Sequence, residues 1–312
     1  MMGIFGRAAT AGAIGVAILA AIANAAVAGK AFDMGPDQKE RIHTTAGEAA
    51  KVIPANYAYV KPGTFVMAMA PFLPPTSYFA TDEKTVIGAN ADLASLIAEK
   101  LGLKLEIQVV AWPDWPLGVS SGKYDAFISD VTVTEERKEK FDFSTYGNDV
   151  IGFYVGADSP IAAIDEPKDI SGLRVIVASG TNHERILLDW NAKNEAAGLK
   201  PAELLYFDDP TAAHLALLSG RADATFVNNS EGAYSAAVNG ETRLVGIVSG
   251  GWPLTAELGV VTRKGSGLDE AVTTAINELI AEGSYVATLK RWSIEGQAVD
   301  RARTNPPGLP KS

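Results

Sequence analysis

The chain contains 312 residues, of which 47% are hydrophobic and 21% are charged, and its formal net charge is −10. This length suits two domains of ordinary size, and the composition is that of a folded globular protein. The negative charge and the lack of a basic stripe argue against a nucleic-acid partner. The absence of cysteine excludes disulfides, thiolate metal sites and cysteine nucleophiles.

The first 28 residues carry the three-part pattern of a secretory signal peptide. Arg7 supplies positive charge, residues 8–23 are almost wholly apolar and small, and Ala26-Val27-Ala28 offers a small-x-small cleavage site. A membrane anchor is the alternative interpretation, but a stretch this rich in Ala and Gly is weakly hydrophobic for a span. A lipid anchor would need a cysteine at the cleavage point. We therefore predict export to the periplasm without a lipid anchor.

A polar arm over residues 29–62 comes next and has room for one short helix. Residues 65–69 form a short apolar run, which predicts a buried strand. Apolar residues then recur at helical spacing over 93–101, and residues 103–109 alternate between apolar and polar as a strand does. This order of strand, helix and strand predicts a βαβ unit in the block 64–153.

The same alternation recurs in a second block, over residues 154–252. In this block, strands are predicted at 174–178 and 224–227, and helices at 183–190 and from Pro210, with Asp209 as N-cap. After the block come a strand at 258–262 and a helix at 268–282, with Gly283 as the stop. Alternating strands and helices predict an α/β fold with mainly parallel sheets. The Pro-rich end, residues 303–312, is expected to be a flexible tail.

The end of one predicted strand has the chemistry of a carboxylate site. The strand ends at Ser129, a polar turn follows, and Thr134 can cap a new helix with Arg137 one turn inside it. Free N–H groups at a helix start and a nearby guanidinium fork together suit a carboxylate. A surface arginine beside Glu135 and Glu136 is the alternative interpretation.

A second predicted strand ends in Ser179-Gly180-Thr181-Asn182. Glycine lets a ligand approach the backbone, and the N–H groups of a helix start favour an anion. In open α/β sheets, ligands bind at the carboxyl ends of the strands. Since both motifs lie at such ends, one in each block, we expect them to face one ligand.

These motifs, in this order and spacing, resemble the family 3 extracellular solute-binding proteins, the polar amino-acid receptors of ABC importers. The resemblance covers about residues 62–299. The residues that carry it are Gly88 to Ala94, Ser121-Gly122-Lys123-Tyr124-Asp125, Thr132 to Arg137, Phe141-Asp142-Phe143-Ser144, Ser179-Gly180-Thr181 and Leu218 to Ala224.

The resemblance implies a two-lobed α/β fold that closes by hinge motion around a small molecule. Lobe one would comprise residues 63–153 and 257–302, and lobe two residues 154–256. The hinge crossovers would lie near 151–155 and 257–261.

The resemblance also implies a set of ligand contacts. Arg137 matches the arginine that clamps the α-carboxylate of the ligand. The other implied contacts are Thr132, Phe72 and Leu73 from lobe one and Gly180, Thr181 and Asn182 from lobe two.

One departure from the family pattern concerns the α-ammonium of the ligand. The family usually has an aspartate after the strand 224–227, whereas this chain has Asn228. A buried ammonium without an anion would be costly. Asp130, where the family commonly has Gly or Ser, is our candidate for the missing charge. The rival hypothesis is a ligand without a free α-ammonium.

We expect a monomeric binding protein, not an enzyme, that needs no cofactor or metal and delivers an amino acid or related carboxylate to ABC transporter membrane subunits. The main alternative is an exported cyclohexadienyl dehydratase, which this family resembles, with Glu231 at the place of the proposed general acid. The non-catalytic interpretation is that Glu231 is a solvated or capping residue at the start of a helix. A sensory domain using the same pocket is a further alternative.

Overall fold

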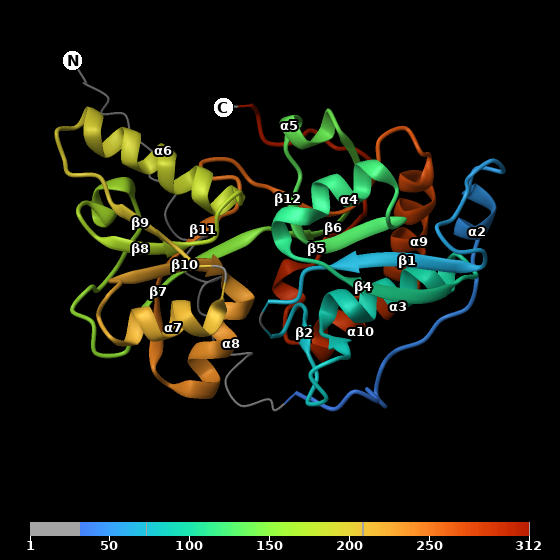
Figure 1. Cartoon of the computed structure of the whole chain (residues 1–312), viewed down its shortest axis with the longest axis horizontal. Coiled ribbons are helices and arrows are strands. Elements are labelled where there is room, and N and C mark those ends of the chain that lie inside the picture. The colour runs from blue at the N-terminus through green and yellow to red at the C-terminus, as the bar shows by residue number, and fades with distance from the viewer. Residues whose placement is uncertain (1–31, 73, 208, 312) are drawn as a thin grey trace, which may run out of the picture.

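The computed structural model describes residues 32–311 except 73 and 208, and it shows two lobes side by side (Figure 1). Each lobe is built on a five-stranded sheet with helices on both faces, which confirms the predicted fold class. The predicted signal peptide, residues 1–28, and the predicted contact Leu73 lie outside the described residues. Among the described residues, no helix combines the length and the apolar character that crossing a bilayer requires.

The sheet of the first lobe is mainly parallel. Its strands, in spatial order, are β4 (Lys104–Val109), β1 (Thr64–Met69), β5 (Ala126–Thr132), β12 (Glu257–Arg263) and β6 (Phe141–Asn148). β1 pairs in parallel with β4 and β5, whereas β12 is antiparallel to both β5 and β6. Because β12 is antiparallel to both of its neighbours, β5 and β6 run in the same direction, and β12 is the one strand of this sheet that runs opposite to the others.

The sheet of the second lobe repeats this plan. Its strands are β11 (Thr242–Ser249), β7 (Val150–Gly156), β10 (Ala224–Asn228), β8 (Arg174–Val177) and β9 (Glu203–Tyr206). β8 is parallel to β9 and β10, and β7 is antiparallel to β10 and β11. A small ribbon of β2 (Tyr78–Phe79) and β3 (Val86–Ile87) follows β1 in the first lobe.

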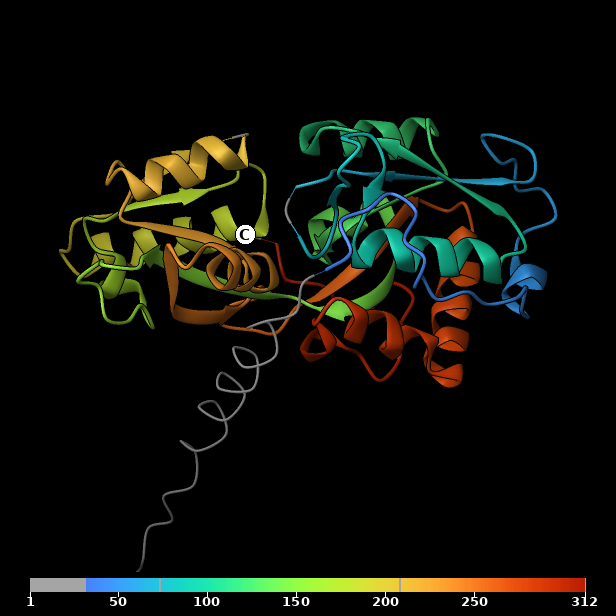
Figure 2. The ribbon, with the colours of Figure 1, turned by 90° about the horizontal axis from the view of Figure 1, so that it is seen from below.

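Helices cover both faces of each sheet (Figures 1 and 2). Lobe one has α2 (Ala49–Val52), α3 (Ala89–Lys100), α4 (Trp115–Ser121), α5 (Glu135–Lys138), α9 (Leu268–Glu282) and α10 (Ser284–Arg291). Lobe two has α6 (Asn182–Ala196), α7 (Pro210–Leu218) and α8 (Asn229–Asn239). The 3₁₀ turns at 112–114 and 295–297 belong to lobe one, and the one at 167–170 belongs to lobe two. Buried side chains of β1, α3 and α9 share one continuous core, and β1, α3 and β4 form the predicted βαβ unit.

Local signals placed several of these helices correctly. α9 has the predicted bounds, and Gly283 after it adopts a left-handed φ of 84°. The Asp209 side chain accepts the N–H of Ala212 at 2.7 Å, as expected of an N-cap before Pro210.

The chain crosses between the lobes at two adjacent places. Asp149 is the single residue between β6 and β7, and residues 250–256 return the chain from β11 to β12. The Asp149 N–H donates to the Ala256 carbonyl at 3.0 Å, and the Gly250 N–H donates to the Asp149 carbonyl at 3.0 Å. The two crossings are therefore tied together at Asp149. The predicted crossover ranges 151–155 and 257–261 form parts of β7 and β12.

The N-terminal arm is fastened to lobe one and touches lobe two. Asp92 of α3 accepts hydrogen bonds from Arg41 of the arm, at 2.7 Å, and from Arg291. At the start of the described arm, the Phe32 ring stacks on Tyr234 of α8, with centroids 5.2 Å apart, and lies 5.2 Å from the ring of Trp292. Phe32 thus lies between an aromatic residue of each lobe.

The C-terminal tail also follows the boundary between the lobes. Leu309 pairs with Thr134 in a parallel bridge, and the Pro310 carbonyl accepts from Arg185 of α6 at 2.6 Å. Residues 303–311, which we expected to be flexible, thus contact both lobes.

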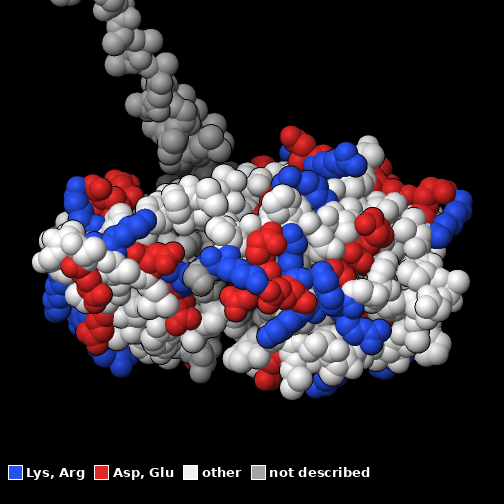
Figure 3. All heavy atoms as spheres, turned by 90° about the horizontal axis from the view of Figure 1, so that it is seen from above, with Lys and Arg blue, Asp and Glu red and all other residues white. Residues whose placement is uncertain are grey.

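On the face seen in Figure 3, acidic and basic side chains are intermingled and form no single-sign patch of the kind that nucleic acid requires.

Candidate functional site

The residues singled out in the sequence meet where the carboxyl ends of the two sheets face each other. β5 ends at Thr132 in lobe one, and β10 ends at Asn228 in lobe two. Hydrogen bonds cross between the lobes at these ends, including one from the Asn228 amide to the Asp130 carboxylate at 3.5 Å. This is the edge at which α/β sheets bind ligands.

Arg137 is held in place by the turn that precedes it. Thr134 caps α5, because its side chain accepts the Arg137 N–H at 3.1 Å, as predicted. The guanidinium donates Nη1 to the Thr132 carbonyl at 2.9 Å and Nη2 to the Gly180 carbonyl of lobe two at 3.4 Å. The ring of Trp115, a core residue, lies 6.0 Å from the guanidinium carbon. The side chain therefore bridges the lobes.

Arg137 keeps its charge at neutral pH. Desolvation lowers its pKa to about 10, while the carboxylates of Asp149 and Glu136 oppose that shift. A guanidinium with five donors, fixed at the boundary of the lobes, is suited to bidentate binding of a carboxylate.

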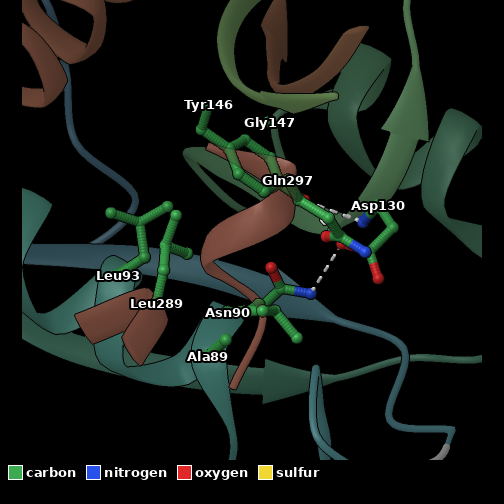
Figure 4. A pocket seen from close by; sticks show the side chains of 9 residues that line it. Ala89, Asn90, Leu93, Asp130, Tyr146, Gly147, Leu289 and Gln297 are labelled. Atoms are coloured by element: carbon green, nitrogen blue, oxygen red, sulfur yellow. Dashed lines mark hydrogen bonds between the residues drawn. The ribbon is translucent and has the colours of Figure 1, made fainter. Parts of the chain in front are cut away.

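Asp130 has an unusual backbone and a well-defined carboxylate. Its φ is 51°, in the left-handed region that costs free energy for a residue with a Cβ atom. Tyr146 accepts the Asp130 N–H at 2.9 Å and donates its hydroxyl to Oδ1 at 3.0 Å. The amide of Asn90, in the first turn of α3, donates to Oδ1 at 3.2 Å, and Figure 4 shows these two side chains pointing toward each other. Burial raises the pKa of Asp130, and these hydrogen bonds oppose the shift.

Glu231 lies in the same region, on α8 of lobe two. It is only 4% exposed, and its Oε1 accepts the hydroxyl of Thr76, from the loop after β1 of lobe one, at 2.9 Å. Burial first, and then the charge of Asp130, raise the pKa of Glu231 to about 8. The alternative interpretation of Glu231 as a solvated residue is therefore wrong, because its side chain is buried and contacts the opposite lobe.

The start of α6 is organised mainly by its own side chains. Gly180 has a φ of 69°, and its N–H donates to the Glu184 carboxylate at 2.6 Å. The Thr181 hydroxyl accepts the Glu184 N–H at 3.1 Å as N-cap and donates to the Ala178 carbonyl at 2.7 Å. The hydroxyl of Thr181, a predicted ligand contact, is thus engaged within the turn. The N–H groups of Asn182 and His183, the first two residues of α6, have no acceptor one helical turn earlier and are what the turn can offer to an anion.

The next two residues of α6 are packed against the same boundary. Asn182 is 6% exposed, and its amide nitrogen has no hydrogen-bond partner among the described residues. The His183 ring packs edge-on against Phe226 at 5.7 Å. Desolvation and the nearby charge of Arg137 lower the pKa of His183 to about 4, so the imidazole is neutral at pH 7.

Thr132 connects Arg137 to the hinge. Its hydroxyl donates to Oδ2 of Asp149 at 2.6 Å, and its carbonyl accepts from Arg137. Burial raises the pKa of Asp149 to about 7, the charge of Asp130 acts in the same direction, and the Thr132 hydrogen bond and Arg137 oppose it.

Phe72 is the predicted contact with the least support from neighbouring groups. Its side chain is 38% exposed and lies in the loop that carries Thr76.

The residues of the site that the sequence did not predict are Thr76, Tyr146 and Asp149. No motif or spacing marks them, and only the meeting of distant segments brings them to the site. The described residues contain no group of three or more His, Asp or Glu side chains that could hold a metal ion.

Comparisons with known proteins agree with this architecture. The family model of the bacterial extracellular solute-binding proteins, family 3, matches residues 65–295. The L-cystine-binding protein TcyJ of Escherichia coli (strain K12) is 29% identical over 234 residues, which cover 74% of this chain and 82% of that protein. The arginine-binding protein ArgT of Corynebacterium glutamicum is 30% identical over 251 residues, covering 80% of both chains.

Solved structures show the same fold. An ancestral arginine-binding protein bound to arginine superposes with a TM-score of 0.63 at 29% identity, covering 74% of this chain and 98% of that one. The cyclohexadienyl dehydratase of Pseudomonas aeruginosa is a more limited match, 27% identical over 149 residues, which cover 48% of this chain and 53% of that protein.

Proposed function

Because the chain belongs to the bacterial extracellular solute-binding proteins of family 3, we propose that it binds a free amino acid or a closely related carboxylate between its lobes. Its relatives are amino-acid-binding proteins of ABC transporters. On this proposal the protein acts in the periplasm as a monomer, without a cofactor, and presents its closed form to the membrane subunits of an importer.

The observation that carries the proposal is Arg137 at the meeting of the lobes. Its guanidinium reaches from α5 of lobe one to the Gly180 carbonyl of lobe two. A ligand carboxylate would take the place of that weak contact at 3.4 Å and accept from the guanidinium and from the first-turn amides of α6. Closure follows because such a ligand binds the closed arrangement of the lobes better than the open one.

Asp130 is our candidate for the ligand's α-ammonium. It faces Asn228, the residue at the family's usual aspartate position, across the cleft. The chain would thus keep one negative charge at this place but carry it on lobe one. The rival proposal, a ligand without an α-ammonium, leaves Asp130 engaged with protein groups such as Asn90, Tyr146 and Asn228.

A thermal-shift screen of the mature protein tests the proposal. The probes are the proteinogenic amino acids, L-cystine and the corresponding acids that lack the α-amino group. A ligand of the folded protein raises the melting temperature by linkage. We expect a shift with at least one free amino acid. A shift only with the acids lacking the amino group would support the rival proposal, and no shift with any probe would contradict amino-acid binding.

Substitution of Arg137 tests the carboxylate clamp with the ligand that the screen identifies. Truncating one partner of a buried charge pair costs about 2–5 kcal/mol, which is roughly a 30-fold to several-thousand-fold loss of affinity. We expect Arg137→Ala to fall in this range by calorimetry. Arg137→Lys keeps the positive charge but not the bidentate guanidinium, and its affinity should lie between those of wild type and Arg137→Ala. A loss below tenfold for Arg137→Ala would show that Arg137 is not the clamp.

One observation favours a second candidate, dehydration of a cyclohexadienyl acid. Glu231 is buried with a pKa of about 8, which makes it a protonated acid at neutral pH. Such a group could give its proton to a leaving hydroxyl while the ring loses carbon dioxide. Turnover of prephenate or arogenate that disappears in Glu231→Gln would establish this activity. Binding without turnover would leave the protein a receptor.

A further inference from the structure

The C-terminal tail, residues 303–311, starts from a fixed point on lobe one. The side-chain oxygen of Asn305 accepts the Phe143 N–H of β6 at 2.9 Å. Its side-chain nitrogen donates to the buried carboxylates of Asp142, at 3.0 Å, and Asp269, at 3.2 Å. This tail lies beyond residue 295, where the match to the family model ends. It is therefore an anchored addition to the part of the chain that matches the family.

From Asn305 the tail runs to the helix that carries Arg137 and pairs with the backbone at its start. The Leu309 N–H donates to the Val133 carbonyl at 3.0 Å, and the Leu309 carbonyl accepts the Glu135 N–H at 2.8 Å. One residue earlier, the Gly308 N–H donates to the Glu135 carboxylate at 2.7 Å. These bonds hold the end of the tail against lobe one.

The Leu309 side chain packs on the hinge. It belongs to a residue that is 7% exposed. A Cβ atom added at Gly251, in the return crossing 250–256, would lie 2.6 Å from Cδ2 of Leu309, so the side chain is in direct contact with the crossing. Hinge motion changes the backbone angles of the segments that join two lobes. Such a change in the crossing would displace Leu309.

Lobe two holds the tail one residue further on. Arg185 of α6 donates Nη2 to the Pro310 carbonyl at 2.6 Å. Figure 2 shows the tail, in dark red, reaching the boundary between the lobes. Among the described residues, this is the one hydrogen bond that the Arg185 side chain makes, and no carboxylate pairs with it. Because the donor is charged, the bond is stronger than one between neutral groups.

We infer that residues 303–311 form a strap that holds the two lobes together in the ligand-free protein. The strap is fixed to lobe one at Asn305 and Leu309 and to lobe two at Arg185. Opening the cleft would break the Arg185 contact or pull Leu309 away from the crossing. This property does not depend on which ligand the cleft takes. Since a ligand binds the closed arrangement, a larger closed population before binding raises the apparent affinity.

Pulsed EPR distances between two spin labels test the strap without any ligand. Leu117→Cys on α4 of lobe one and Leu215→Cys on α7 of lobe two place the labels, because both side chains are exposed. We expect Arg185→Ala to raise the ratio of open to closed molecules by about three- to tenfold. That is the effect of one charge-assisted hydrogen bond weakened by its position at the surface. Identical distance distributions for wild type and Arg185→Ala would overturn the inference.

Two further variants separate a strap from general loosening. Lys311→Ala is the matched control, because Lys311 pairs with Glu139 of lobe one, and its distances should match those of wild type. Leu309→Ala should favour the open form, and adding Arg185→Ala to it should have little further effect, since both act through the same segment. An opening by Lys311→Ala as large as that by Arg185→Ala, or full additivity of Leu309→Ala and Arg185→Ala, would contradict the strap.

Discussion

Replacing Glu231 with glutamine should change how the stability of the protein depends on pH. In the folded protein the pKa of Glu231 is raised from the ordinary 4.5 to about 8 by burial and by the charge of Asp130. Between these two values the folded protein holds the proton and the unfolded chain releases it. The contribution of Glu231 to stability is thus complete below pH 4.5 and is lost as the pH rises toward 8.

The size of the effect follows from proton linkage. One proton held only by the folded state changes the free energy of unfolding by at most about 1.4 kcal/mol per pH unit. Between pH 6.5 and 8, wild type should therefore lose up to about 2 kcal/mol that Glu231→Gln does not lose. His183, whose pKa is lowered to about 4, changes its contribution mainly below this window. Asp149 titrates within the window but is present in both proteins, so its effect cancels in the difference.

The assay is urea unfolding of the two proteins at half-unit intervals of pH. The free energy of unfolding of wild type should fall toward pH 8 relative to that of Glu231→Gln. Thr76→Val serves as a control, because it removes a hydrogen bond that favours the ionised form of Glu231 and should steepen the fall. If wild type and Glu231→Gln run parallel from pH 6.5 to 8, Glu231 does not titrate as a buried acid and the argument fails.

Three other substitutions test parts of the fold that hold the site. Asp130→Gly should match wild type in stability while Asp130→Ala loses about 1 kcal/mol of its free energy of unfolding, since φ is 51° there; equal urea midpoints for the two variants would rule out strain. Asp92→Ala should lose about 3 kcal/mol or more and lower the melting temperature, because it removes the buried carboxylate that accepts from Arg41, Arg291 and Trp292. Phe32→Ala, but not the exposed Phe79→Ala, should widen the distance between spin labels placed on the two lobes, for which this cysteine-free chain needs only two introduced cysteines.

The elements that the sequence predicted well are those with strong local signals. α9 combines an amphipathic pattern with a glycine stop, and α7 begins at an Asp-Pro cap, so neighbouring residues determine both. The segments after β5 and β8, which carry Arg137 and Gly180, were predicted to lie on opposite sides of one site, and a hydrogen bond joins these two residues between the lobes. That expectation required only the rule that ligands bind at the carboxyl ends of parallel strands.

The remainder of the site depends on contacts that no local signal contains. Thr76 and Glu231 are 155 residues apart in the chain, and the burial of Glu231 exists only because the two lobes meet there. The pairing of Thr132 with Asp149 depends on where the chain crosses between the sheets. Motif matching identified the positions that touch a ligand in the family, whereas the acids that set their protonation and donor state come from tertiary packing.

The placement of charge in this cleft has a consequence for the order of binding. In the pattern that the resemblance to the family implies, the carboxylate clamp lies on lobe one and the anion for the ammonium on lobe two, so the second charge would be satisfied only on closure. Here lobe two offers the neutral amide of Asn228, and the candidate anion Asp130 lies seven residues before Arg137 on lobe one. On our proposal, both charges of an amino acid are satisfied by the open lobe one, at Arg137 and Asp130. Lobe two then adds hydrogen bonds and excludes water, which strengthens contacts already made. Affinity would therefore reside largely in lobe one, and closure would add the hydrogen bonds of lobe two and the exclusion of water.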